Sequence, residues 1–260
     1  IVINFDELDK LFVERINILG NFITDEKVIR NLLIVDEGDP YNEVLFNKSI
    51  QNIKAQNIFK EVNYETNIDE NSNKIIDIEV EEKATGEISA GAGVGTSGGT
   101  IAFGIKENNY LGKGVRLDTN FSLSEDRIKG KFLVSNPNFR NSDKEINLSL
   151  ESTATDRMSS FGYKSNKTGF SVGTSFEYLD DMRLGLSTKS FIEKITVDST
   201  ASTRQKKQEG NYFDSFIGLD LFYDKRNQKY ETTSGFFSNY NLSTPVLSDT
   251  NTITNAYNYK

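Results

Sequence analysis

Cysteine, histidine and tryptophan are all absent from this chain of 260 residues. The lack of cysteine excludes a disulfide framework, a thiolate metal site and a thiol nucleophile. Because histidine is missing too, a Ser-His-Asp triad, a Cys-His pair and most zinc sites are also excluded. The net charge of −8 argues against nucleic acid as a main partner, since phosphate binding needs a basic face.

Long hydrophobic runs are missing as well. Apolar residues make up 36% of the chain, and no stretch approaches the roughly 18–20 apolar residues of a membrane-spanning helix. This excludes a helical membrane protein but not a β-barrel, whose strands alternate lipid-facing and lumen-facing residues. The first residues carry no signal-peptide pattern, and residues 256–260 read as the middle of a strand. We therefore expect a piece of a longer chain.

Charge and hydrophobic period both change near Ala84–Gly86. Residues 1–85 contain 9 Lys/Arg against 18 Asp/Glu, whereas residues 86–260 contain 21 against 20. The change of period at the same place predicts a domain boundary there.

The first region predicts a small α+β domain with the order β-α-α-β-β. Thr24 has the form of a helix N-cap, followed by acids in the first turn. The apolar positions expected to face inward on the two helices are Val28, Ile29, Leu32 and Leu33 on the first, and Leu45, Ile50 and Ile53 on the second. The expected strands are residues 12–18, 59–67 and 74–82, and the second helix is expected over residues 42–56.

From Gly86 onward the hydrophobic period is two. We predict about nine strands, near residues 87–95, 99–107, 114–124, 127–136, 144–154, 168–179, 182–194, 212–223 and 235–244. Their lengths suit tilted strands that cross a bilayer and are long for a soluble sandwich. Alternation alone also allows a sandwich with one wet face, such as a soluble carbohydrate-binding domain.

Two features favour the membrane reading. The polar face of the predicted strands carries many charges, as a water-filled lumen permits. Aromatic residues gather near strand ends, as an interfacial girdle requires: Tyr110, Phe139, Phe161, Tyr163, Phe213, Tyr223, Tyr230, Phe236 and Phe237.

Several motifs, in order along nearly the whole chain, resemble the BamA-type outer-membrane assembly proteins. Residues 13–21, Thr24, residues 28–30 and residues 37–39 resemble the start of a POTRA domain, and Ser49, Ile53, Ile58, Phe59 and Val62 resemble its second helix and following strand. Residues 86–95 resemble the first barrel strand of that family, and the segments 108–114, 136–139, 224–226 and 233–235 resemble later barrel turns.

The resemblance implies a domain organisation. Residues 1–10 would end a preceding POTRA domain, residues 11–84 would form the last POTRA domain, and residues 85–260 would supply about nine of sixteen strands of an antiparallel transmembrane barrel. The family's Val-Arg-Gly-Phe loop motif is not found in this sequence. If the POTRA domain is periplasmic, the longest connections, residues 155–167 and 194–211, face the outside.

The resemblance also implies a function without a catalytic step or a cofactor. A protein of this type assembles and inserts β-barrel proteins in the bacterial outer membrane, with its POTRA domain in the periplasm. The implied partners are unfolded outer-membrane proteins, accessory lipoproteins and outer-membrane lipids, and not nucleic acid. The alternative function is a two-partner secretion pore or a related passive translocation pore.

The strand at residues 87–95 is the main candidate site, because glycine and alanine weaken a strand by removing side-chain packing. In a barrel this strand would be the lateral seam, able to open from the last strand. The alternative is that its glycines make room for a neighbouring loop or a bulky side chain. The seam residues are Glu87, Ile88, Ser89, Ala90, Gly91, Ala92, Gly93, Val94 and Gly95.

Two weaker candidate sites lie in the POTRA-like region. The strand at residues 59–67 is a candidate edge for β-augmentation through Glu61, Asn63 and Glu65, although an ordinary solvated edge explains the pattern equally well. Arg30 and Glu37 fall where the resemblance implies an accessory-lipoprotein contact, although such charges commonly just face solvent.

No catalytic site is expected. The acidic pairs Glu81-Glu82, Glu125-Asp126 and Asp180-Asp181 lie at predicted strand ends or turns, where charges are simply solvated. The segment 97–99 reads as a hairpin turn, because no helix or lysine of a phosphate-binding loop follows it. No metal or cofactor is expected either.

Overall fold

The structure is a computed structural model that describes residues 10–70, 72–95, 98–199, 201–227, 232–248 and 253–260. It divides into two compact units. The first comprises residues 1–85 and 108–114, and the second comprises residues 86–107 and 115–260. The expected remnant of a preceding domain, residues 1–10, lies almost wholly outside the described residues.

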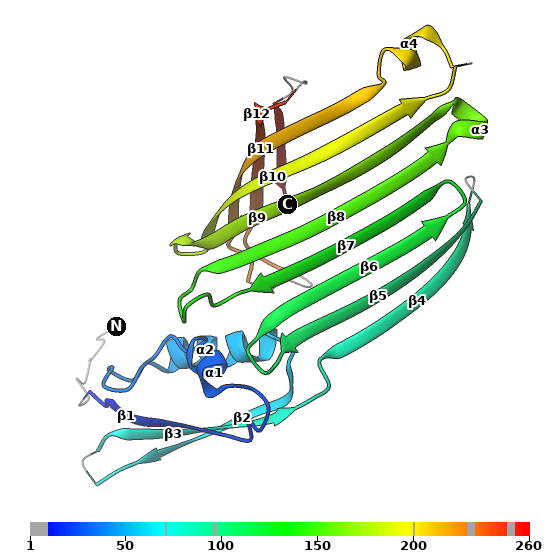
Figure 1. The fold of residues 1–260 in the computed structure, drawn as a ribbon. Coiled ribbons are helices and arrows are strands. Elements are labelled where there is room, and N and C mark those ends of the chain that lie inside the picture. The colour runs from blue at the N-terminus through cyan, green and yellow to red at the C-terminus, as the bar shows by residue number, and fades with distance from the viewer. Residues whose placement is uncertain (1–9, 71, 96–97, 200, 228–231, 249–252) are drawn as a thin grey trace. The chain divides into compact units, whose positions relative to one another are not determined.

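The first unit has the predicted β-α-α-β-β order (Figure 1). Its central strand β3 pairs in parallel with β1 and antiparallel with β2, in the order β1-β3-β2. The elements are β1 (Val13–Leu19), α1 (Glu26–Arg30), α2 (Glu43–Ala55), β2 (Phe59–Ile68) and β3 (Lys74–Glu82).

One hydrophobic core holds this unit together. It consists of Val13, Ile16, Ile29, Val35, Phe46, Ile50, Ile53, Ile58, Phe59, Val62, Ile76, Ile78 and Val80. In α2 the prediction that Leu45 faces inward was wrong, because Leu45 is 39% exposed and Phe46 is buried in the core. Ile50 and Ile53 are buried as predicted.

The start of α1 also differs from the prediction. The N-cap is Asp25, whose side chain accepts a hydrogen bond from the Lys27 N–H, and not Thr24. The helix ends at Arg30, so Leu32 and Leu33 pack against the core from the segment after it. Thr24 has a different role, because its buried side chain binds a remote turn.

That turn is residues 108–114, which belong to the first unit although they are distant in sequence. The Asn109 side-chain amide donates a hydrogen bond of 2.9 Å to the Thr24 hydroxyl, and its oxygen accepts one from the Gly114 N–H. The Asp25 N–H donates to the Gly112 carbonyl at 2.8 Å. Gly112 needs its small size, since a Cβ there would lie 2.0 Å from the Ile23 carbonyl oxygen.

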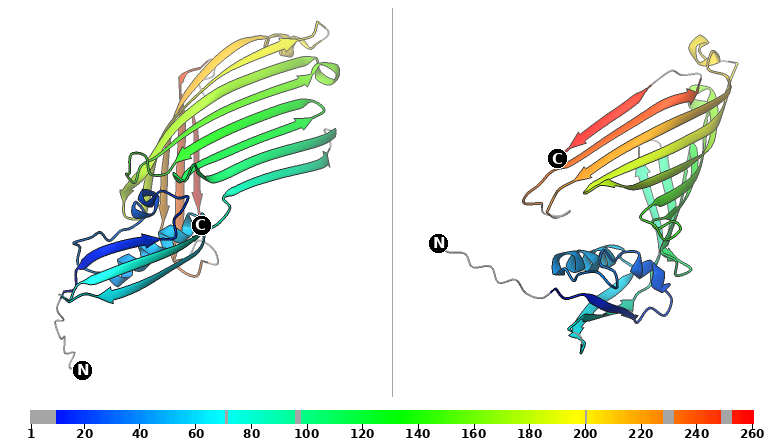
Figure 2. Two further views of the ribbon diagram at one scale, coloured as in Figure 1. Left: turned by 60° about the horizontal axis from the view of Figure 1, so that its bottom comes forward. Right: turned by 90° about the vertical axis from the view of Figure 1, so that its left-hand side faces the viewer.

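The second unit is one antiparallel sheet of ten strands in sequence order, strongly curved (Figures 1 and 2). The strands are β4 (Gly86–Gly95), β5 (Gly98–Tyr110), β6 (Val115–Ser124), β7 (Arg127–Asn136), β8 (Glu145–Arg157), β9 (Tyr163–Leu179), β10 (Met182–Val197), β11 (Gly210–Asp224), β12 (Phe237–Leu247) and β13 (Thr254–Tyr259). Two short helices, α3 (Met158–Phe161) and α4 (Thr203–Lys206), lie between strands. About nine strands were predicted, and β13 is the tenth.

The alternation predicted from the sequence gives the sheet one apolar and one polar face. Apolar side chains such as Phe121 and Leu150 are about half exposed, at 55% and 49%. The polar face carries cross-strand ion pairs, with Lys129 Nζ 3.3 Å from Glu151 Oε1 and Lys167 Nζ 3.6 Å from Glu193 Oε2. In the described part of the chain, no helix is long and apolar enough to cross a membrane.

Strands β8, β9 and β10 are longer than predicted. Most of the connection expected at residues 155–167 is strand, because β8 and β9 pair as far as Arg157↔Tyr163. In this part both faces are polar: Lys164 forms an ion pair with Asp156 at 2.5 Å, and Ser165 donates to Glu193 at 2.6 Å. The apolar alternation that marks a strand in sequence is therefore absent there.

The aromatic girdle stays a prediction, although some aromatic residues near strand ends pack together. Tyr223 and Tyr259 both pack on Phe236, with ring centroids 5.3 and 5.8 Å from it. Tyr163 instead lines a cavity together with polar residues. Tyr230 lies outside the described residues.

Candidate functional site: the glycine-rich edge strand

Strand β4 forms one edge of the ten-stranded sheet. Among the described residues it pairs only with β5, in a regular antiparallel ladder from Gly86↔Glu107 to Gly95↔Gly98. Each of its ten residues is exposed, including Ile88 at 73% and Val94 at 92%. A row of backbone N–H and C=O groups is thus free to pair with another strand.

The glycines of β4 are not required by crowding among the described residues. A Cβ added at Gly91, Gly93 or Gly95 would meet no atom within 4 Å. Gly104 on β5 is the contrasting case, because a Cβ there would lie 2.6 Å from the Ser89 hydroxyl oxygen. The space around β4 therefore offers no support for the alternative that its glycines accommodate a bulky neighbour.

Side-chain pairing across β4 and β5 is sparse on the polar face. Beyond Glu87↔Lys106 and Ser89↔Gly104, the opposed pairs are Gly91↔Ala102, Gly93↔Thr100 and Gly95↔Gly98. Cross-strand side-chain pairs contribute roughly 0.2–1 kcal/mol each. This half of β4 is held mainly by backbone hydrogen bonds, so side chains add little to its pairing.

The predicted augmentation edge, β2, is an edge strand of the small sheet. Glu61, Asn63 and Glu65 are exposed, and β2 pairs with β3 alone among the described strands. A groove of about 440 Å³ runs beside the first half of β2, lined by Lys54, Asn57, Phe59, Lys60, Glu61, Val62, Asn63 and Lys83. An extended peptide would find free backbone groups along this edge.

Arg30 and Glu37 bind the opposite edge strand, β1, at one residue. The Ile16 N–H donates to Glu37 Oε1 at 2.9 Å, and the Ile16 carbonyl accepts from Arg30 Nη2 at 2.9 Å. The two side chains also lie 3.5 Å apart as an ion pair and remain partly exposed. They occupy backbone groups that another strand would need, which leaves β2 as the more available edge.

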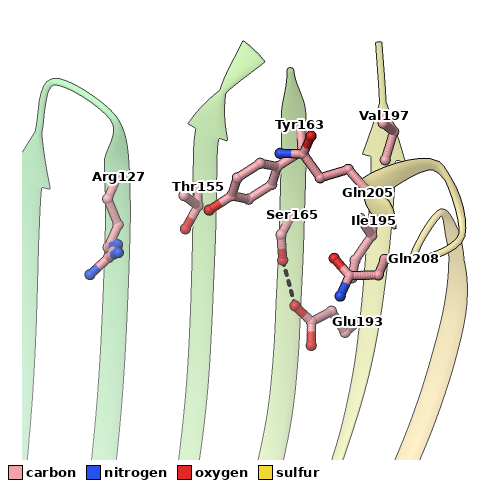
Figure 3. A pocket seen from close by; sticks show the side chains of 9 residues that line it. All are labelled: Arg127, Thr155, Tyr163, Ser165, Glu193, Ile195, Val197, Gln205 and Gln208. Atoms are coloured by element: carbon pink, nitrogen blue, oxygen red, sulfur yellow. Dashed lines mark hydrogen bonds between the residues drawn. The ribbon is translucent and has the colours of Figure 1, made fainter. Parts of the chain in front are cut away.

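A polar cavity of about 400 Å³ lies on the polar face where β7 to β10 meet the segment containing α4 (Figure 3). Ser165 and Glu193 are hydrogen-bonded within it, and the Tyr163 ring points toward Thr155. It is lined by Arg127, Thr155, Tyr163, Ser165, Glu193, Ile195, Val197, Gln205 and Gln208. Glu193 is its single carboxylate, so the cavity lacks a pair for acid–base catalysis.

Three carboxylates of the acidic pairs have partners in the structure. Glu81 lies 2.7 Å from Lys60 Nζ, and Asp126 lies 2.6 Å from Arg157 Nε. Glu82 accepts from the N–H groups of Ile23 and Thr24 at 2.9 and 2.6 Å. In the described part of the chain, no group of three or more His, Cys, Asp or Glu residues is placed to hold a metal ion.

One cluster of exposed apolar side chains was not predicted from the sequence. The turns at residues 20–25 and 108–114 meet within the first unit and expose Phe22 at 95%, Ile23 at 73% and Leu111 at 72%. The available signal was Phe22-Ile23 directly after the turn pair Gly20-Asn21, outside any periodic pattern.

Comparisons with known proteins match both units. A family model described as "Omp85 superfamily domain" matches residues 109–258, and a POTRA model described as "Surface antigen variable number repeat" matches residues 11–83. Three relatives are named "Outer membrane protein assembly factor BamA". The one from Neorickettsia risticii is 26% identical over 242 residues, covering 87% of this chain and 31% of the relative. The one from Neisseria meningitidis is 24% identical over 171 residues, covering 64% and 22%.

Solved structures share the fold. BamA from Haemophilus ducreyi lacking POTRA domains 1–3 aligns with a TM-score of 0.70 and 20% identity, covering 93% of this chain and 49% of that one. CdiB from Acinetobacter baumannii aligns with a TM-score of 0.57 and 9% identity, covering 96% and 48%.

The chain spans less than a third of the length of the curated relatives it matches. The Omp85 match nevertheless covers more than half of this chain, and the resemblance to BamA-type proteins is confirmed. With a POTRA domain and an incomplete barrel sheet of the BamA type, the chain belongs to the Omp85 superfamily.

Proposed function

We propose that this chain is part of a protein that folds and inserts β-barrel proteins into the bacterial outer membrane. Three relatives carry the name outer membrane protein assembly factor, which supports both the location and the activity. The activity belongs to the whole protein, of which this chain is a part.

The observation that carries the proposal is the exposed, glycine-rich edge strand β4. In a closed barrel its free edge would pair with the last strand, because an unpaired backbone group in hydrocarbon costs several kcal/mol. With open space at Gly91, Gly93 and Gly95, side chains add little to that pairing. The seam is therefore the place at which such a barrel opens with the least loss of contacts.

An opened seam acts as a template. Its backbone N–H and C=O groups pair with a strand of the incoming protein, and backbone pairing is largely indifferent to the side chains of that strand. Indifference to sequence suits a protein that serves many substrates. The insertion consumes no cofactor and needs no chemical step.

The POTRA domain would act in the periplasm, before insertion. Its β2 edge, with Glu61, Asn63 and Glu65, would hold extended segments of unfolded substrates by β-augmentation. Arg30 and Glu37 are half-exposed and would offer a charged surface to an accessory lipoprotein. In that role they would also keep the β1 edge closed.

A passive translocation pore is the second candidate function, because CdiB proteins share this fold at TM-scores of 0.57 and 0.58. The two functions differ in where the client protein passes. A transported segment would cross the polar face of the sheet, near Lys167. A strand being assembled would pair with β4.

Site-specific photo-crosslinking in the full-length protein tests this difference. A photoreactive residue at Ala92 of β4 should capture substrate strands during assembly. A second probe replaces Lys167 on the polar face and would capture a segment that crosses the pore. The matched control is Leu148, which lies on the apolar face of the interior strand β8. Adducts at Lys167 with none at Ala92 would favour the pore, and equal adducts at Ala92 and Leu148 would contradict templating.

A further inference from the structure

We propose that Phe22, Ile23 and Leu111 form a lipid contact at the periplasmic surface of the outer membrane. This inference rests on the proposed function only for the statement that β5 and β6 cross that membrane. The three side chains belong to the first unit, in the turns at residues 20–25 and 108–114. They are 95%, 73% and 72% exposed, although large apolar side chains usually avoid water.

The two turns are in direct contact. The Asp25 N–H donates to the Gly112 carbonyl at 2.8 Å, and the Asn109 amide donates to the Thr24 hydroxyl at 2.9 Å. Thr24 and Asp25 are the two residues after Phe22-Ile23. Their partners, Asn109 and Gly112, lie on either side of Leu111 in the sequence. The exposed apolar residues therefore lie on two joined turns and not at scattered positions.

Chain connectivity places Leu111 four residues before Val115, the first apolar residue of β6. Residues 111–114 join β5 directly to β6. The apolar series of β6 begins with its first residue, Val115, and continues through Leu117 with period two. A strand rises about 3.3 Å per residue, so Leu111 lies within a few residues of the hydrocarbon boundary.

The composition of the cluster fits the interfacial region of a bilayer, because one aromatic and two aliphatic side chains lie together on the two joined turns. Aromatic and aliphatic side chains are favoured where a protein enters the interfacial region of a bilayer.

The backbone of Leu111 is an independent observation. Leu111 has a positive φ of 54°, a conformation in which glycine or asparagine is preferred over leucine. A bulky side chain kept in a strained and exposed position suggests that it serves an interaction outside the fold. Because the apolar series of β6 begins only four residues after Leu111, lipid is the partner assigned to this side chain.

Tryptophan quenching by lipid tests the contact, and this chain contains no tryptophan of its own. The variant Phe22→Trp in the full-length protein is reconstituted in phosphatidylcholine vesicles, with and without brominated acyl chains, and compared with the parent protein. The matched control is Ile68→Trp, which is 63% exposed at the end of β2. Ile68 pairs with Lys74 at one end of β3, whereas Glu82 at the other end holds the turn at Ile23.

Bromine should remove most of the added emission at position 22 and leave that at position 68 almost unchanged. Adding Leu111→Asn to Phe22→Trp should weaken the quenching without lowering the thermal midpoint. Equal quenching at the two positions would overturn the proposal, as would a blue-shifted emission at position 22 that bromine does not quench, which would indicate a protein partner. Assembly activity is measured on the same samples, so quenching without assembly would support this contact and count against the proposed function.

Discussion

The carboxylate of Glu82 organises the turn that precedes α1. Burial alone would raise the pKa of this carboxyl. Hydrogen bonds from the Thr24 hydroxyl and from the N–H groups of Ile23, Thr24 and Phe22 outweigh burial, so the pKa lies below its ordinary value of 4.5. Glu82 thereby links the end of β3 to Thr24, which in turn accepts a hydrogen bond from Asn109.

A depressed pKa makes the stability of the first unit depend on pH. The ionised Glu82 contributes stability above the carboxyl's unfolded-state pKa, and this contribution is lost as pH falls through the lower folded-state value. Denaturant unfolding at a series of pH values below 4.5 should show a loss of stability. The variant Glu82→Gln should lose about 1 kcal/mol at neutral pH, because it gives up charge-assisted hydrogen bonds at a partly exposed site.

The control is Glu79→Gln, an exposed carboxylate on the same strand β3. It should keep the acid sensitivity of the parent protein, whereas Glu82→Gln should reduce it. An unchanged pH profile in Glu82→Gln would contradict the role given to this carboxylate.

At the residue scale, sequence patterns predicted partners poorly wherever a contact is remote. Thr24 followed by acids is a typical N-cap pattern, yet Asp25 caps α1. The competing contact is with Asn109, which is 85 residues away and leaves no trace in local sequence. The core positions Ile50 and Ile53 were predictable, because helical period and burial depend on near neighbours.

At the scale of elements, β4 is set apart by what it lacks. The double variant Gly91→Thr/Gly93→Thr of β4 has space for both new side chains, since nothing lies within 4 Å of either added Cβ. Each new cross-strand pair should strengthen pairing by roughly 0.2–1 kcal/mol. If opening of the seam is needed for assembly, about 1 kcal/mol of added pairing should slow assembly about fivefold.

Gly99→Thr on β5 is the matched control for this experiment. It also has open space, and its partner is Val94 of β4, so it adds to β4–β5 pairing without touching the outer edge of β4. Assembly rates are compared in reconstituted vesicles at equal protein levels. A Gly99→Thr variant as slow as the β4 double variant would show that general stiffening, and not the seam, is responsible.

Strand ends show where prediction from alternation stops. Strands with one apolar and one polar face were predicted to within a few residues, as for β7 at residues 127–136. The end of β10 was also predicted as a connection, although Ile195 and Val197 continue its alternation. The ends of β8 and β9 next to α3 were predicted as a connection because both of their faces are polar. There the strands are maintained by backbone pairing and by contacts such as Asp156 with Lys164, which hydropathy does not register.

On the scale of the whole molecule, the two compact units divide between residues 85 and 86, with one exception. Residues 108–114 lie in the middle of the barrel-like sequence but belong to the first unit. Their glycines at positive φ, Gly112 and Gly114, mark a turn in sequence but do not say what it packs against. We expect residues 11–83 to fold on their own, and in isolation this segment would lack the Asn109 contact to Thr24.

The central claim is that the edge of β4 must open for assembly, and a reversible lock tests it most directly. One cysteine is placed between Ser89 and Gly93, and its mate is placed on the final strand of the full-length protein; this chain contributes no other cysteine. The oxidised, verified cross-linked form should retain its fold and lose assembly activity, and reduction should restore that activity. Normal assembly by the cross-linked form would contradict the account.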